Sequence, residues 1–247
     1  MCSMESRKEK HLIYDPLAME ATDRLRDSFR SVKRKKLQNT RILAETVLFD
    51  RMLGSFLCEH ANTVVLNLAC GLDTRCYRME GLYRTWYNLD RPEILAVRKS
   101  LFPVRDSVRE TASDFHNSLR RNLAEESDHP ILVLLKENSL CLSAPEIRSV
   151  FHRIDDCFDC AAIFMETMSP FALRCRKELF GKETAAKVLY RANSDPSPAE
   201  GIPPFRLVES RSLAEGMCTL SSRYRFFAKL PPVHRLSGQI LKYQKEK

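Results

Sequence analysis

The sequence predicts an α/β fold in which a mostly parallel sheet carries helices on both faces. From Thr63 onward, short apolar runs alternate with segments of helix length, as expected for strands joined by crossover helices. One apolar run ends in the small residues Ala69, Cys70 and Gly71, and a second, WYNLD, ends at Asp90. A small-residue turn and an acidic residue at the ends of neighbouring parallel strands are typical of a nucleoside pocket.

The segment before the first strand is predicted to be helical and to cap the sheet. Pro16 suits the first turn of a helix, and apolar residues then recur at near-helical spacing up to Phe29. A second helix with a broad apolar face is expected over Thr40–Cys58. We therefore expect a helical cap over residues 1–60 and a nucleoside-binding domain over residues 61–247.

The second domain is predicted to alternate strands and helices. Strands are expected at Thr63–Ala69, Thr85–Leu89, Val108–Ala112, Ile131–Lys136 and Ala161–Met165. Helices are expected at Pro92–Leu101, Phe115–Ala124, Ala144–Ile154 and from Phe171 onward. Ser143 and Glu146 form a capping-box pattern at the start of the third of these helices.

The C-terminal part is predicted to add an antiparallel strand pair. Residues Asn193–Phe205 are rich in Pro and Ser, which indicates a loop. FRLVES (205–210) and SRYRFFAKL (222–230) then have strand patterns around a short helix at Leu213–Met217. The last residues, LKYQKEK, are interpreted as a basic tail.

Composition indicates an ordinary globular protein. The 247 residues are 44% hydrophobic and 29% charged, with no apolar run near the roughly 20 residues of a membrane span and no signal-peptide core, so a cytoplasmic location is expected. The nine cysteines are scattered and are interpreted as reduced thiols. Cys157 and Cys160 form the only CxxC, without a matching second pair of ligands, so no metal site is predicted.

The net charge of +8 raises the question of nucleic acid. Much of the excess is contributed by Arg24, Arg26, Arg30, Lys33, Arg34, Lys35, Lys36 and Arg41. We favour a solvated helix face, because aromatic residues that stack on bases do not regularly interleave with these charges. A surface that binds RNA or an anionic substrate is the alternative.

The turn after the first strand carries residues suited to an anionic ligand. Gly71 alone favours an ordinary strand-to-helix turn, and Asp73 is a good helix N-cap residue. Arg75 and Arg78 add two cations that suit a carboxylate. Asp90, 19 positions after Gly71, suits the hydroxyls of a ribose, although it also suits a cap for the helix at Pro92.

LACGLDTR (68–75) and WYNLDRPE (86–93) resemble motifs of the leucine carboxyl methyltransferase family, a branch of the O-methyltransferases. The resemblance implies a Rossmann-like class I methyltransferase sheet with an antiparallel terminal strand. It implies S-adenosyl-L-methionine as the cofactor. It also implies transfer of a methyl group to an oxygen, carboxylate or hydroxyl, of a small-molecule or carboxyl substrate.

The resemblance also implies the residues of the site. The turn would wrap the methionine part of the cofactor, Asp90 would bind ribose, Asp114 and Phe115 would frame the adenine, and Glu137 would meet the amino group. The expected cofactor-binding residues are therefore Ala69, Gly71, Asp73, Arg75, Asp90, Asp114, Phe115 and Glu137. No catalytic residue is assigned, because a carboxylate nucleophile needs no general base at neutral pH.

The chain departs from the family pattern at several positions. Ala69 replaces the first glycine of the turn, Leu142 replaces a tyrosine, and relatives carry one more helix before HLIYDPLA (11–18). Glu45 stands where relatives tend to have an arginine for the cofactor carboxylate, a role left to Arg41, Arg51 or Arg75. The alternatives are therefore a catalytically weakened or inactive cofactor-binding member, or a basic RNA-binding or RNA-modifying protein.

Overall fold

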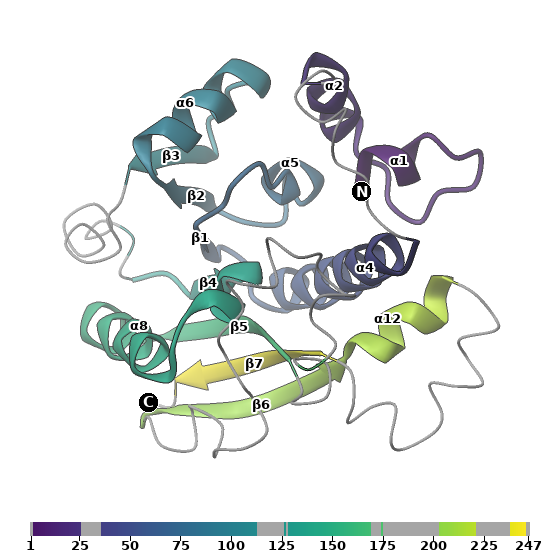
Figure 1. Ribbon diagram of the computed structural model, residues 1–247. Helices are drawn as coiled ribbons and strands as arrows, with labels where there is room; N and C mark the ends of the chain where they lie inside the picture. The colour runs from purple at the N-terminus through teal and green to yellow at the C-terminus, as the bar shows by residue number, and fades with distance from the viewer. Residues whose placement is uncertain are drawn as a thin grey trace.

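The computed structural model describes residues 2–25, 36–112, 126, 128–168, 174, 203–220 and 238–245. Within these ranges the chain forms a seven-stranded sheet with the order β3-β2-β1-β4-β5-β7-β6 (Figure 1). The strands are β1 (Val64–Leu68), β2 (Thr85–Asp90), β3 (Val108–Ala112), β4 (Ile131–Leu135), β5 (Ala161–Thr167), β6 (Phe205–Ser212) and β7 (Gln239–Lys245).

The sheet has the predicted class of topology. Strands β1 to β5 pair in parallel, while β7 lies antiparallel between β5 and β6. All residues of β1, β4 and β5 are buried, because helices cover both faces of the sheet, and this explains their continuous apolar sequences. Strands β2 and β3 are added on one side of β1, and β4 and β5 are added on its other side. The switch point, where the strand order reverses, therefore lies between β1 and β4.

Helices pack on both faces of the sheet. They are α1 (Cys2–Ser6), α2 (Pro16–Arg24), α4 (Lys36–Glu59), α5 (Arg75–Arg78), α6 (Pro92–Leu101), the 3₁₀ helix η2 (Glu137–Cys141), α8 (Ala144–Cys157) and α12 (Leu213–Leu220). On one face α8 packs through residues such as Phe151 against β1, β4 and β5. On the other face α4 packs through residues such as Phe49 against Trp86 and Phe164. None of the helices in the described ranges has both the length and the apolarity of a membrane span.

Helix α4 shares its hydrophobic core with the sheet. The rings of Phe49 and Phe164 meet edge to face with centroids 6.0 Å apart. Helix α12 also packs closely on α4, because Gly216 has no side chain: a Cβ there would lie 2.2 Å from the carbonyl oxygen of Ala44. The division at residue 60 into a cap and a cofactor domain stays a prediction.

The C-terminal strands differ in part from the sequence prediction. Strand β6 and helix α12 lie where they are expected. The strand next to β5 is Gln239–Lys245, whereas the sequence from Leu241 onward is interpreted as a basic tail. Ile240, Leu241 and Tyr243 of this strand are buried, and the intervening lysines and glutamines hid its strand pattern. The segments predicted at Phe115–Ala124, after Phe171 and at 222–230 lie outside the described residues, apart from Arg174.

Candidate functional site

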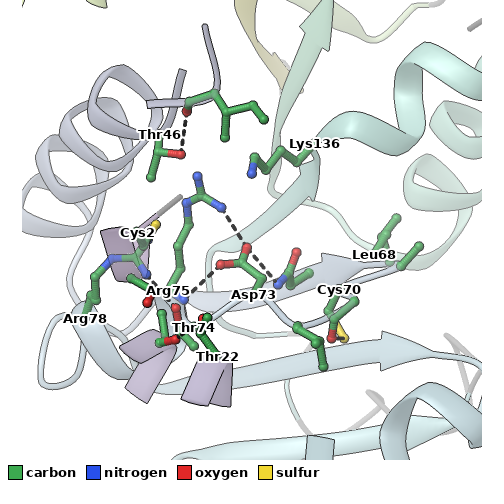
Figure 2. A pocket seen from close by; sticks show the side chains of 17 residues that line it. Cys2, Thr22, Thr46, Leu68, Cys70, Asp73, Thr74, Arg75, Arg78 and Lys136 are labelled. Atoms are coloured by element: carbon green, nitrogen blue, oxygen red, sulfur yellow. Dashed lines mark hydrogen bonds and ion pairs between the residues drawn. The ribbon is translucent and has the colours of Figure 1, made fainter. Parts of the chain in front are cut away.

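A cavity of about 510 Å³ lies at the carboxyl ends of β1 and β4, beside the switch point of the sheet (Figure 2). The turn after β1 forms one wall, and side chains of α1, α2 and α4 form the opposite side. This volume is in the range of sites for small molecules and cofactors, about 300 to 1,000 Å³. Four of the residues predicted from the sequence line it: Ala69, Gly71, Asp73 and Arg75.

The turn has a left-handed backbone at two positions. Gly71 has φ of 52° and Ala69 has φ of 47°. Glycine adopts this conformation without steric cost, whereas a residue with a Cβ loses roughly 1 to 2 kcal/mol. A Cβ added at Gly71 would meet no atom within 4 Å, so the conformation, and not the available space, favours glycine there. The alanine that replaces the expected first glycine therefore sits at a strained position.

Ala69→Gly is expected to stabilise the protein. The change removes the left-handed strain but makes the unfolded chain more flexible, so we expect a net gain of about 0.5 to 1 kcal/mol in the free energy of unfolding. Gly71→Ala is the matched control and should lower this free energy, because it introduces the same strain. Urea unfolding of both variants checks the prediction, and equal stability of the two variants and the wild type would contradict it.

Two side chains that do not line the cavity, Asp90 and Arg98, form hydrogen bonds with the backbone of the turn. The Asp90 carboxylate accepts a hydrogen bond from the Gly71 amide at 2.8 Å. The Arg98 guanidinium donates to the carbonyl oxygens of Gly71 and Asp73 at 2.9 and 2.8 Å. Glu110 on β3 accepts from Arg98 Nε at 3.0 and 3.1 Å. The shape of the turn is therefore fixed by α6 and by two neighbouring strands.

Asp90 is predicted to contact a ribose, and in the structure its carboxylate supports the turn. One oxygen accepts from Gly71, and the other accepts from the amide of Arg91 at 2.8 Å. A carboxylate oxygen can accept two hydrogen bonds, so each retains acceptor capacity for a ligand hydroxyl. The structure thus shows that Asp90 stabilises the turn, while its predicted contact with ribose stays a prediction.

Arg98 is not among the site residues predicted from the sequence, although its position in α6 carries a signal. Leu95, Arg98 and Leu101 form the buried stripe of α6, and Arg98 is 0% exposed. An arginine at an apolar position of a helix indicates a specific buried acceptor, because an unpaired charge there would be costly. The acceptors here are Glu110 and the carbonyls of the turn.

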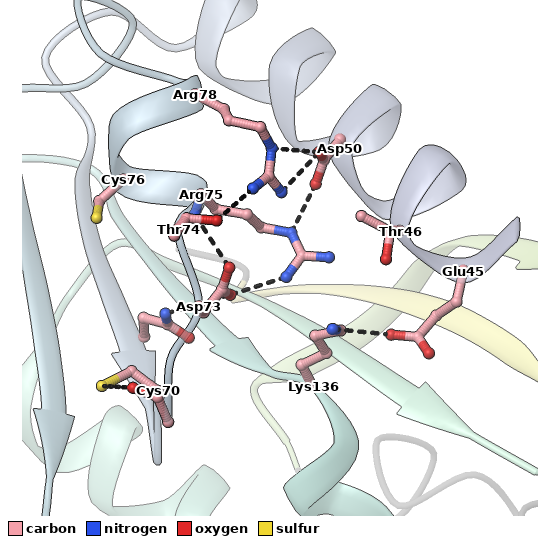
Figure 3. Close-up of polar contacts among 12 residues, drawn as sticks. Glu45, Thr46, Asp50, Cys70, Asp73, Thr74, Arg75, Cys76, Arg78 and Lys136 are labelled. Carbon is pink, nitrogen blue, oxygen red and sulfur yellow. Dashed lines mark hydrogen bonds and ion pairs between the residues drawn. The ribbon is translucent and has the colours of Figure 1, made fainter. Parts of the chain in front are cut away.

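The two arginines after the turn differ in their availability to a ligand. Arg78 donates to Asp15 at 2.6 Å and to Asp50 at 2.9 and 3.0 Å, which links α5 to α2 and α4. Arg75 donates through Nε to Asp50 at 2.6 Å and through Nη1 to Asp73 at 2.8 Å (Figure 3). Its Nη2 atom is buried and has no hydrogen-bond partner among the described residues. Arg75 therefore presents an unused donor in a side chain that lines the cavity.

Charge pairing keeps the groups of this wall ionised. Burial alone would raise the pKa of Asp73. The positive charges of Arg75, Lys136 and Arg78 outweigh this effect and hold the pKa well below its usual range. Burial alone would lower the pKa of Arg75, yet Asp73 and Asp50 raise it above its ordinary value. Burial raises the pKa of the Cys70 thiol, which is therefore neutral and a poor nucleophile.

Glu45 does not face the cavity as an uncompensated charge. It is fully buried, and its carboxylate lies 3.3 Å from Arg41 Nη1 and 3.3 Å from Lys136 Nζ. Arg41 also pairs with Glu166 at 3.0 Å. Of the three arginines that the sequence offered in place of the family arginine, Arg75 lines the cavity, whereas Arg51 lines a separate hollow beside β6.

The structure describes only some of the other residues that the sequence predicts at the site. Glu137 begins η2 directly after β4 and Lys136. Asp114 and Phe115 lie outside the described residues. Leu142, the expected substitute for a tyrosine, packs against the core formed by α8 and the sheet. The capping box of α8 is confirmed, because the Ser143 amide donates to the Glu146 carboxylate at 2.7 Å.

The strand order, the antiparallel β7 and the cavity at the switch point define a Rossmann-like fold of the class I methyltransferase type. A putative methyltransferase from Thermobifida fusca has this fold with a TM-score of 0.62 at 17% identity, over 99% of this chain and 92% of that one. Magnesium protoporphyrin IX methyltransferase from Synechocystis, solved with bound SAH, has a TM-score of 0.58 at 11% identity, over 94% and 100% of the two chains.

The chain belongs to the leucine carboxyl methyltransferase family, whose model matches residues 2–155. It is also similar to the tetracenomycin polyketide synthesis O-methyltransferase TcmP of Streptomyces glaucescens, with 25% identity over 181 residues. That match covers 71% of this chain and 65% of the relative. The family recognised from LACGLDTR and WYNLDRPE is thus confirmed.

Proposed function

We propose that the protein is an S-adenosylmethionine-dependent O-methyltransferase that transfers a methyl group to an oxygen of a small-molecule or carboxyl acceptor. Arg75 carries this proposal. It is a buried cation whose Nη2 donor has no partner within the described part of the chain, and it lines a cavity at the switch point of a methyltransferase-type sheet. An unsatisfied buried donor is costly, so a ligand carboxylate at this position would stabilise the folded protein. Membership of the family supports the same conclusion.

The residues of the cavity fit this cofactor. Arg75 would bind the carboxylate of its methionine part, and the left-handed turn at Ala69 and Gly71 would lie against that part. Asp90, which supports the turn but is not among the residues that line the cavity, would accept from the ribose. When bound, S-adenosylmethionine supplies a methyl group made electrophilic by the positively charged sulfur. Asp90 and Arg98 hold the turn in one shape before any ligand arrives, which reduces the entropy lost on binding.

The acceptor is expected on the side of the cavity formed by α1 and α2. The lining residues there, Cys2, Ser3, Ala18 and Thr22, carry no charge at neutral pH. Burial raises the pKa of the Cys2 thiol, so it stays protonated. The chain would act mainly by aligning the incoming oxygen behind the methyl group, since orientation alone accounts for a large part of such a barrier.

Methyl transfer can be tested with S-adenosylmethionine labelled in the methyl group and a panel of carboxylic acids and phenols. We expect acceptor-dependent transfer of label. Alkaline treatment then distinguishes the products, because a methyl ester releases volatile methanol and a methyl ether does not. Binding of the cofactor without transfer to any acceptor would contradict the proposal. It would favour the inactive cofactor-binding member, an alternative that the alanine at position 69 supports.

Asp90→Ala is expected to weaken cofactor binding by about 1 to 3 kcal/mol, the cost of losing hydrogen bonds to a charged acceptor. Asp90→Asn is the informative companion, because its amide oxygen can still accept from Gly71 and keep the turn in shape. Calorimetric titration with S-adenosylhomocysteine measures both variants. If Asn binds as tightly as the wild type while Ala does not, the carboxylate serves the turn and not the ribose.

A further inference from the structure

Lys136 places a second cation at the cavity, next to the wall formed by Arg75. It follows β4 directly and lines the same cavity as the turn. Its ammonium nitrogen lies 3.3 Å from Oε1 of Glu45, and 21% of its side chain is exposed. Figures 2 and 3 both show the side chain extending from the end of β4 toward the space beside the Arg75 guanidinium.

The need to balance the negative charge of Glu45 does not by itself explain why a lysine lies at position 136. Glu45 is 0% exposed and has a second cation, because Arg41 lies one turn earlier on α4 with Nη1 at 3.3 Å. A buried carboxylate that loses its one partner is strongly destabilising, but Glu45 would keep Arg41 if the lysine ammonium also contacted a ligand. Lys136 can therefore share its charge between Glu45 and the cavity.

The charges along this wall alternate in sign. The positive charge of Lys136 acts on Asp73, and the negative charge of Glu45 acts on Arg75, so the four groups lie within electrostatic range of one another. Arg75 pairs with Asp73 at 2.8 Å, and Lys136 pairs with Glu45 at 3.3 Å. A wall with two cations and two carboxylates is complementary to a zwitterion, which carries one charge of each sign.

We propose that Lys136, oriented by Glu45, binds the carboxylate at the amino-acid end of the cofactor together with Arg75. The inference rests on the proposed function and specifies one part of its ligand. Arg75 contributes the Nη2 donor that has no partner among the described residues, and Lys136 contributes a rotatable ammonium group. The second cation for this carboxylate thus comes from the end of β4, while α4 supplies the acidic residue that positions it.

The test compares two ligands that differ only in this end. S-adenosylhomocysteine carries the amino-acid group, whereas 5′-methylthioadenosine lacks it and keeps the nucleoside and sulfur. We expect Lys136→Met to weaken S-adenosylhomocysteine about 10- to 100-fold, as for loss of a charged hydrogen bond, and to leave methylthioadenosine unchanged. Lys136→Arg should retain most of the affinity. Lys99→Met, at an exposed lysine of α6 outside the cavity, should change neither.

Glu45→Gln provides a second, opposite test. The glutamine keeps the size of the side chain and a neutral oxygen near Lys136, while the negative charge that competes with the ligand carboxylate is removed. We expect S-adenosylhomocysteine to bind up to about tenfold more tightly and methylthioadenosine to bind as before. Arg41 keeps Glu166 as its partner at 3.0 Å, which limits the structural damage. Thermal unfolding of each variant shows that it is folded.

The outcomes separate this inference from the proposed function. If the wild type binds both ligands and Lys136→Met leaves both affinities unchanged, or lowers both equally, the inference is overturned and the proposed function stands. If the folded wild type binds neither ligand at millimolar concentration, the proposed function fails and the inference fails with it. A selective loss of S-adenosylhomocysteine affinity supports both.

Discussion

Replacing Arg75 with methionine is expected to reduce the affinity for S-adenosylhomocysteine by at least about 100-fold, the largest effect on binding of any change at the cavity. Arg75 is 1% exposed and joins Asp50 to Asp73. Its Nη2 atom, which no group in the described ranges accepts from, is the donor that we assign to the ligand carboxylate. Removing the guanidinium therefore removes both the contact and the positive charge that offsets Asp73.

Arg75→Lys separates geometry from charge. Lysine keeps the positive charge but cannot donate in three directions from a planar group, so it cannot satisfy Asp50, Asp73 and a ligand together. We expect its affinity to lie between those of the wild type and Arg75→Met. Calorimetric titration with S-adenosylhomocysteine and with methylthioadenosine measures the effect. If a folded Arg75→Met variant bound S-adenosylhomocysteine with wild-type affinity, the carboxylate would not lie at Arg75.

Replacing Arg98 with methionine is expected to have the largest effect on stability, a loss of about 3 to 5 kcal/mol in the free energy of unfolding. The side chain is fully buried, so its removal leaves Glu110 without its cation and two carbonyls of the turn without their donor. Breaking a buried charge pair from one side has a cost of this size. Because the turn would lose its fixed shape, we also expect weaker cofactor binding in the fraction that remains folded.

Two controls accompany the Arg98 variant. Arg91→Met changes an exposed arginine at the start of the same helix and should alter stability by no more than about 0.5 kcal/mol. Glu110→Gln keeps an acceptor for Arg98 and should cost less than Arg98→Met. Urea unfolding ranks the three variants. If Arg98→Met were no less stable than Arg91→Met, the hydrogen bonds from Arg98 to the turn would contribute nothing to the fold.

Much of the fold was predictable because its signals are local. The buried parallel strands β1, β4 and β5 read as continuous apolar runs, and their positions agree with the sequence prediction to within two residues. The capping box at Ser143 and the proline at position 92 likewise mark helix starts from a few neighbouring residues. Strand β7 was missed because its half-buried lysines and glutamines interrupt the buried apolar residues Ile240, Leu241 and Tyr243.

The partners of the charged side chains could not be predicted in the same way. Asp50 and Arg75 are 25 positions apart, Arg98 and Gly71 are 27 apart, and nothing in the local sequence relates such pairs. The pairing of Glu45 with Lys136 could not be predicted either, because Lys136 lies at the end of a strand that is distant in the sequence. The sequence placed the turn and its arginine at the site, whereas the charge balance around them depends on the folded sheet.

A crystal structure with S-adenosylhomocysteine tests the central claim most directly. We expect the ligand in the cavity between the turn at 69–73 and α4, with its carboxylate within about 2.7 to 3.2 Å of Arg75 Nη2. Density for the ligand elsewhere, or a carboxylate that points away from Arg75, would contradict the assignment of this site. No ligand density at saturating concentration, in a crystal form that leaves the cavity open, would contradict the proposed function itself.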